Sequence, residues 1–204
     1  MRKTLLLLLF ICPTAFGTDS PRVLILGDSL SAGYGLSAGQ SWVNLLQARL
    51  DESGYPRKVV NASISGDTTR GGLARLPRAL KIYQPAVVII ELGGNDGLRA
   101  LPISEIRRNM DSMIRLAGES GAAVLIAGIR LPPNYGTDYT TRFHNTLKDS
   151  AEAGSATFVP FILEDVALEP GMMQGDGIHP TAAAQAQILD NIWPYLEPLV
   201  EDPD

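Results

Sequence analysis

Cysteine is nearly absent from this chain of 204 residues, which has a single one, Cys12, near its N-terminus. A lone cysteine excludes an internal disulfide framework and a multi-thiolate metal centre. Aromatic residues make up only 6% of the chain, and 17 basic residues are outnumbered by 22 acidic ones. Because there is no basic excess or cluster, we do not expect nucleic acid as a partner.

Long apolar runs are also lacking, and the one notable run is at the start. Arg2 and Lys3 precede seven apolar residues, 5–11, and Ala15-Phe16-Gly17 follows as a small-x-small site. This order predicts a secretory signal peptide, residues 1–17, and cleavage near Gly17/Thr18. An uncleaved anchor would need about 20 apolar residues, so the mature chain is predicted to have no transmembrane segment. Lipid attachment at Cys12 is disfavoured by the large residue Ile11 before it.

Removal of residues 1–17 would take away two positive charges and the only cysteine, so the net charge of −5 would become −7. The mature protein would then be periplasmic or secreted, free of thiols, and unable to use cysteine for catalysis. Residues 18–204 are long enough for one α/β domain and too short for two. We expect a single domain and a monomer.

Short apolar β-rich runs alternate with segments of helical period along the rest of the chain. Five such alternations predict a parallel sheet covered on both faces, a three-layer αβα domain. A weaker helix is expected over about 140–153. The predicted strands are 23–26, 59–60, 87–90, 124–127 and 157–159. The predicted helix faces carry Trp42, Leu45, Leu46 and Leu50; Leu73, Leu76, Leu80 and Tyr83; Ile106, Met110, Met113 and Ala117; and Ala186, Leu189, Ile192, Leu196 and Leu199.

Four polar or glycine-rich segments come between a predicted strand and a predicted helix. Strand-to-helix loops of a parallel sheet share one edge, so these segments are expected to meet in space although they span residues 27–179. They are Gly27-Asp28-Ser29, residues 61–67, Gly93-Gly94-Asn95-Asp96 and residues 176–179.

Ser29 is the candidate nucleophile at this edge, and it needs a base within reach. The chain has two histidines. His144 lies in a predicted helix and is interpreted as an ordinary surface or half-buried histidine. His179 follows Asp176 by three positions, so that carboxylate can orient its imidazole from the same loop. The alternative is that Asp28 and Ser29 only cap a helix and that Asp176 only starts a turn.

Acyl transfer through Ser29 also requires donors for an oxyanion. The N–H of Ser29, the backbone N–H of Gly66 and the side-chain amide of Asn95 are candidates. The alternatives are a turn that requires positive φ at Gly66 and a loop amide bonded to its own backbone at Asn95.

Together these blocks resemble the SGNH, or GDSL, hydrolases. Gly27-Asp28-Ser29-Leu30-Ser31, Gly66, Gly93-Gly94-Asn95-Asp96 and Asp176-x-x-His179 match the four family blocks, and the wider pattern is similar to the thioesterase I, lysophospholipase and arylesterase branch. The resemblance covers essentially the whole predicted mature chain. It implies a flavodoxin-like fold, a nucleophile at Ser29, a base at His179 with Asp176 as partner, and oxyanion donors at Gly66 and Asn95.

Other readings fit less well. Ser31 stands where the Gly-x-Ser-x-Gly motif of an α/β-hydrolase needs glycine, and Gly72-Leu73 stand where a P-loop needs Lys then Ser or Thr. A non-catalytic flavodoxin-like binding module would explain the glycine-rich loops but not the serine, histidine and aspartate. With no HExxH motif and no cysteine ligand, we predict no metal and no cofactor.

The predicted activity is that of a secreted serine esterase acting on acyl esters and thioesters, of the arylesterase, lysophospholipase and acyl-CoA thioesterase type. The partner is a small-molecule or lipid acyl ester, and a carbohydrate acetyl esterase is the alternative. Apolar residues in loops near the site are the candidate wall of an acyl groove. They are Leu98, Leu101, Ile103, Leu131, Pro132 and Tyr135.

Overall fold

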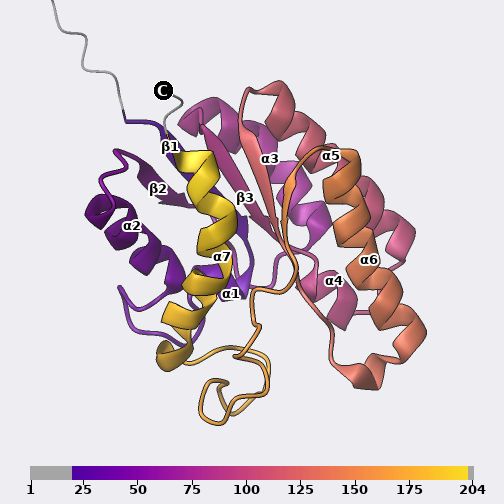
Figure 1. The fold of residues 1–204 in the computed structure, drawn as a ribbon. Helices are drawn as coiled ribbons and strands as arrows, with labels where there is room; N and C mark the ends of the chain where they lie inside the picture. Colours follow the sequence, from indigo (N-terminus) through magenta and orange to yellow (C-terminus); the bar gives the residue numbers. More distant parts are fainter. Residues whose placement is uncertain (1–19, 202–204) are drawn as a thin grey trace, which may run out of the picture.

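A sheet of five parallel strands forms the centre of the computed structural model, which describes residues 20–201 (Figure 1). The strand order is β2-β1-β3-β4-β5, the flavodoxin-like order, in which the winding reverses after β2. The strands are Arg22–Gly27 (β1), Lys58–Asn61 (β2), Val87–Glu91 (β3), Ala123–Ala127 (β4) and Thr157–Val159 (β5). The predicted signal peptide, its cleavage site and Cys12 lie outside the described residues.

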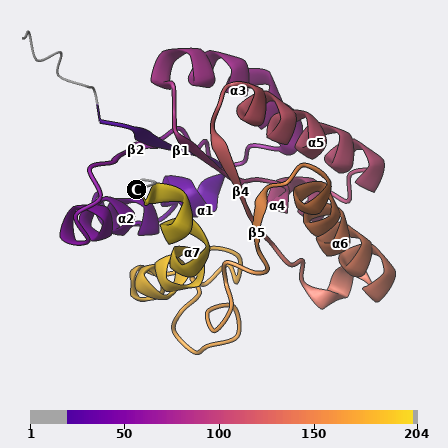
Figure 2. The same ribbon diagram turned by 45° about the horizontal axis from the view of Figure 1, so that its top comes forward.

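Two layers of helices cover the sheet. Figure 2 shows α2 and α7 on one face and α3, α5 and α6 on the other. This confirms the predicted αβα architecture, and each expected strand and helix is present. The helices are Ser29–Ala32 (α1), Trp42–Glu52 (α2), Thr69–Tyr83 (α3), Gly94–Leu98 (α4), Ile103–Glu119 (α5), Thr137–Ala153 (α6) and Gln185–Val200 (α7), with 3₁₀ turns at Pro133–Tyr135 and Ala182–Ala184.

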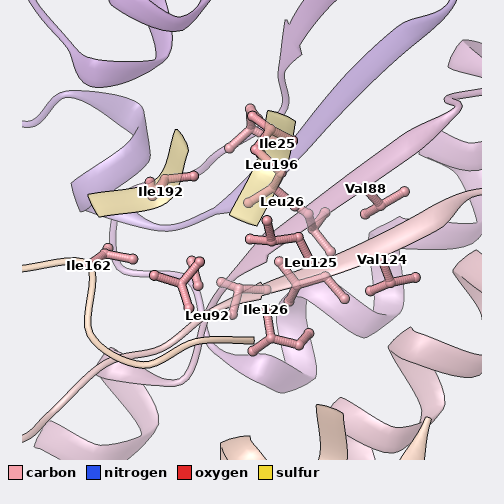
Figure 3. Close-up of a cluster of buried hydrophobic side chains, with 14 of the residues drawn as sticks. Ile25, Leu26, Val88, Leu92, Val124, Leu125, Ile126, Ile162, Ile192 and Leu196 are labelled. Atoms are coloured by element: carbon pink, nitrogen blue, oxygen red, sulfur yellow. The ribbon is translucent and has the colours of Figure 1, made fainter. Parts of the chain in front are cut away.

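The core lies between the sheet and these helices. Figure 3 shows part of it, with Ile25, Leu125 and Ile126 of the strands and Ile192 and Leu196 of α7, all fully buried. Burying one such side chain stabilises the fold by about 1.5–3 kcal/mol. The helix layers are thus held against the sheet by the apolar faces that the helical period predicts.

Capping residues end the loops at the carboxyl ends of the strands and begin the helices that follow. The Asp28 side chain accepts a hydrogen bond from the N–H of Leu30 and starts α1, and Thr68 accepts one from Gly71 to start α3. Residues 160–181, between β5 and α7, form turns instead of a helix. In Figure 1 this orange-to-yellow segment lies beyond the edge at which α1 and α4 are found. Within residues 20–201 no helix is both long and apolar enough to span a bilayer.

Candidate active site

Ser29 is the first residue of α1, directly after β1 and Asp28. The Asp28 carboxylate caps the helix by accepting the N–H of Leu30 at 3.1 Å, which leaves the Ser29 hydroxyl free. The Oγ atom of Ser29 lies 2.9 Å from Nε2 of His179. The hydroxyl therefore faces a ring nitrogen that is able to take its proton.

The other ring nitrogen of His179, Nδ1, lies 2.6 Å from Oδ2 of Asp176. Oδ1 of the same carboxylate accepts the backbone N–H groups of Ile178 at 2.9 Å and His179 at 3.0 Å. The hydrogen bond from the His179 side chain and these two backbone bonds hold the pKa of Asp176 well below its usual range. Because an ionised carboxylate only accepts, Nδ1 carries the hydrogen and Nε2 presents its lone pair to Ser29.

Asp176 and His179 are held by a hairpin-like loop, residues 173–180, closed at its base by an isolated antiparallel bridge. The N–H of Gln174 donates to the carbonyl of His179 at 2.7 Å, and its side-chain amide donates to the carbonyl of Tyr34 at 2.9 Å. The Tyr34 ring lies 4.4 Å, centroid to centroid, from the imidazole. The loop is thus docked on the segment that follows α1.

Asn95 lies in α4, after β3, which is the neighbour of β1 in the sheet. Its Nδ2 donates to Oδ2 of Asp28 at 2.9 Å. One amide hydrogen is thereby used and the second stays available to a ligand. Burial raises the pKa of Asp28 to about 6, so this carboxyl is mainly ionised at neutral pH and accepts the bond from Asn95.

Gly66 has a φ of 80°, a conformation that favours glycine. A Cβ there would meet nothing within 4 Å, so the backbone conformation alone requires glycine. The Arg99 guanidinium donates to the carbonyl of Gly66 at 3.1 Å. Within residues 20–201, neither the N–H of Gly66 nor that of Ser29 has an acceptor. Both are therefore free donors, Gly66 on the loop after β2 and Ser29 at the start of α1.

A groove of about 380 Å³ begins beside Asp28 and Asn95. Loops after β3, β4 and β5 form its walls, and Arg130 is the only basic residue among those that line it. Its apolar lining includes Leu98, Leu131, Phe161, Leu163, Met173 and Ile178. An acyl chain attached to a carbonyl at Ser29 would find apolar surface here.

A family model supports this chemistry: residues 25–187 match the GDSL-like Lipase/Acylhydrolase family. The chain belongs to this family. It is a serine hydrolase. The names of the three relatives described next indicate an esterase.

Three curated relatives of this GDSL-like hydrolase share about half of its sequence. It is 52% identical over 178 residues, 87% of this chain and 89% of the relative, to "Esterase TesA" of Pseudomonas aeruginosa. It is 46% identical to "Arylesterase" of Vibrio mimicus, over 93% of this chain and 95% of the relative. It is 45% identical to "Thioesterase 1/protease 1/lysophospholipase L1" of Escherichia coli, over 87% and 84%. These names match the branch that the motifs resemble.

A crystal structure of TesA superposes on the chain with a TM-score of 0.86 at 52% identity. The match covers 87% of this chain and 99% of that one. The fold of this GDSL-like hydrolase is therefore the SGNH hydrolase fold.

The six predicted groove residues fall into two groups. Leu98, Leu131 and Pro132 line the groove, whereas Leu101, Ile103 and Tyr135 are not among its lining residues. The Tyr135 hydroxyl instead donates to the carbonyl of Leu98 at 2.9 Å and so supports the groove wall. Ile103 begins α5 and packs against the core. Leu101 comes where the chain turns from α4 into α5.

His144 lies in α6, half-buried, and is separate from the Ser29 hydroxyl and the groove. Its ring is 5.8 Å from that of Phe158, and burial together with the nearby Arg130 lowers its pKa. Neither ring nitrogen has a contact with Ser29, which leaves His179 as the histidine at the nucleophile.

Several site residues were not anticipated from the sequence. Glu91 is fully buried at the end of β3, below Asp28, and Gln174 ties the His179 loop to Tyr34. Phe161 and Leu163, in the groove wall after β5, were also missed. The signal for Glu91 is a charged residue at the end of an otherwise apolar strand. Residues 20–201 contain no group of three His, Cys, Asp or Glu side chains that could hold a metal ion.

Proposed function

We propose that this protein is an exported esterase that hydrolyses acyl esters and thioesters through an acyl-enzyme on Ser29. The contact that carries the proposal is the chain of hydrogen bonds from Ser29 Oγ to His179 Nε2, at 2.9 Å, and from His179 Nδ1 to Asp176, at 2.6 Å. A serine hydroxyl is a weak nucleophile at neutral pH, and this arrangement supplies the base it needs.

In the acylation step, Ser29 Oγ attacks the carbonyl carbon while its proton moves to Nε2 of His179. Asp176 stabilises the imidazolium that forms, and it keeps its own negative charge. The negative carbonyl oxygen accepts hydrogen bonds from the N–H groups of Ser29 and Gly66 and from the free amide hydrogen of Asn95.

The tetrahedral intermediate then collapses as His179 returns the proton to the leaving alcohol or thiol. This leaves the acyl group esterified to Ser29. A water molecule attacks the acyl-enzyme, giving its proton to His179, and the carboxylic acid leaves with Ser29 restored. Both half-reactions use the same three donors for the oxyanion.

The apolar groove favours an acyl chain as the main recognition element of the substrate. Leu98, Leu131 and Met173 can contact methylene groups, each worth about 0.8 kcal/mol when buried. A carbohydrate acetyl ester, the alternative substrate, would leave this apolar surface unused. We propose all three classes of substrate, aryl esters, lysophospholipids and acyl thioesters. They correspond to activities in the names of the relatives.

We also propose export by the signal peptide of residues 1–17, with residues 18–204 as the mature single-domain monomer. The intact mass of protein from a periplasmic fraction should correspond to a chain that starts near Thr18. Full-length protein confined to the cytosol would contradict export, and the elution volume in size-exclusion chromatography tests the monomer.

The catalytic assignment is tested with a fluorophosphonate probe and p-nitrophenyl esters. Wild type should take up one label, and Ser29→Ala should lose both labelling and turnover. His144→Ala is a matched control and should keep both, while His179→Ala should lose turnover. Labelling that persists in Ser29→Ala would contradict the assignment. A parallel series of acyl thioesters, lysophospholipid and acetylated sugars would assign the substrate class.

A further inference from the structure

A second carboxyl group lies beneath the nucleophile, on the neighbouring strand. Glu91 ends β3 and pairs in register with Gly27, the last residue of β1. Its side chain is completely buried. A Cβ on Gly27 would come within 2.9 Å of Glu91 Oε2, so the absence of a side chain at position 27 makes room for this carboxyl. The catalytic steps proposed above do not use Glu91.

Glu91 contacts the segment that carries Ser29 at three points. Its Oε2 accepts the hydroxyl of Ser31 at 2.8 Å and the backbone N–H of Asp28 at 3.3 Å. Its carboxyl group also contacts the carboxyl of Asp28. Within residues 20–201 no arginine or lysine forms an ion pair with either carboxyl group.

Two buried carboxyl groups in contact, without a cation between them, cannot both be ionised at neutral pH. Asp28 is the better site for the negative charge, because it accepts the N–H of Leu30 and the amide of Asn95. Oε1 of Glu91 has no N–H or O–H partner in the described part of the chain, so it can carry the proton. The O–H of Glu91 then donates to Asp28, and burial together with the charge of Asp28 raises the pKa of Glu91 accordingly.

We propose that Glu91 is a positioning residue of the esterase reaction: as a neutral carboxylic acid it donates a hydrogen bond to Asp28, and Asp28 in turn aims the Asn95 amide at the oxyanion. This inference rests on the proposed function. Asp28 is the only hydrogen-bond partner of the Asn95 side chain within residues 20–201, so the direction of that amide depends on where the Asp28 carboxylate is held.

The test compares two substitutions at one position. In Glu91→Gln the amide is neutral, can donate to Asp28 and can accept from Ser31, so kcat should stay within about threefold of wild type. Glu91→Leu has a similar volume but no donor. Its kcat should fall by about 10²-fold, as for the loss of an oxyanion donor, with KM for a p-nitrophenyl ester little changed.

A double-mutant cycle separates positioning from a general structural role. In an Asn95→Ala background the Glu91→Leu change should cost less than about threefold, because the amide it positions is gone. An equal loss in both backgrounds, or a Glu91→Gln enzyme as poor as Glu91→Leu, would overturn the proposal. Fluorophosphonate titration counts active sites and circular dichroism monitors folding. Should Glu91→Leu fail to fold, the kcat of Glu91→Gln in both backgrounds still tests the proposal, because a large loss of kcat in Glu91→Gln would overturn it. An inactive, unlabelled wild type would refute the proposed function instead.

Discussion

Replacing Glu91 by glutamine should change how the stability of the fold depends on pH. Burial and the neighbouring Asp28 raise the pKa of Glu91 well above its ordinary value, whereas in the unfolded chain a glutamate titrates near 4.3. At a pH between these two pKa values, folding therefore takes up a proton at Glu91. The stability that this group contributes is full below about pH 4 and is lost as pH rises towards its folded pKa.

The size of this change in the pH dependence of stability follows from the uptake of one proton. Where the folded protein keeps the Glu91 proton and the unfolded chain has lost it, wild type should lose at most about 1.4 kcal/mol of unfolding free energy per pH unit through this one group. Glu91→Gln has no such proton to take up. The unfolding free energy of Glu91→Gln minus that of wild type should therefore rise with pH, by at most this amount per pH unit. A constant difference in stability between the two proteins does not change this slope.

Urea denaturation at constant ionic strength, followed by tryptophan fluorescence, measures this difference. Glu119→Gln makes the same chemical change on an exposed carboxylate that pairs with Arg115, so its curve should run parallel to wild type. Because Asp28 remains in every variant, its own titration cancels to first order. Parallel curves for wild type and Glu91→Gln would show that Glu91 is ionised in the folded protein, and they would refute the reasoning.

Three further predictions concern activity. Asp176→Asn should fold normally but lose about 10⁴-fold in kcat, because the amide holds the wrong imidazole tautomer; a normal kcat would contradict the hydrogen-bond chain. Activity should decline as pH falls through about 6, because Asp28 gains a proton there and no longer fixes Asn95 as a carboxylate. The kcat of Asn95→Ala should be about 10²- to 10³-fold lower than that of wild type, and its pH-rate profile should lack the decline that protonation of Asp28 causes. Leu98→Ser should lose turnover on long acyl chains and spare acetate, by up to about fourfold per methylene no longer buried, whereas Leu101→Ser should act equally on all chain lengths.

The strands, the long helices and the meeting of distant loops could be predicted because each depends on a short-range pattern. Apolar runs such as 87–90 and spacings such as Ile106, Met110 and Met113 specify the elements. The parallel sheet then brings all strand-to-helix loops to one edge. With only two histidines in the chain, that edge was enough to select His179 as the partner of Ser29.

Glu91 could not be assigned in the same way. Whether its carboxyl is solvated or buried depends on what stands opposite on β1, and the register that places Gly27 there is a tertiary property. The groove shows the same limit. Nearness in sequence to Asn95 suggested Leu101 and Ile103, but the chain turns away into α5 and packs Ile103 on the core. The wall after β5 has no helical or strand period, so no pattern marked it.

The separation of Ser29 from His179 by 150 positions ties catalysis to completion of the fold. The serine begins α1, directly after the first strand, and its proposed base lies on the loop before the last helix, so a partly folded chain holds an inert hydroxyl and a solvated imidazole. Closing a loop of this length is favourable only once the intervening sheet has assembled. Ester hydrolysis therefore reports the arrival of the whole native topology.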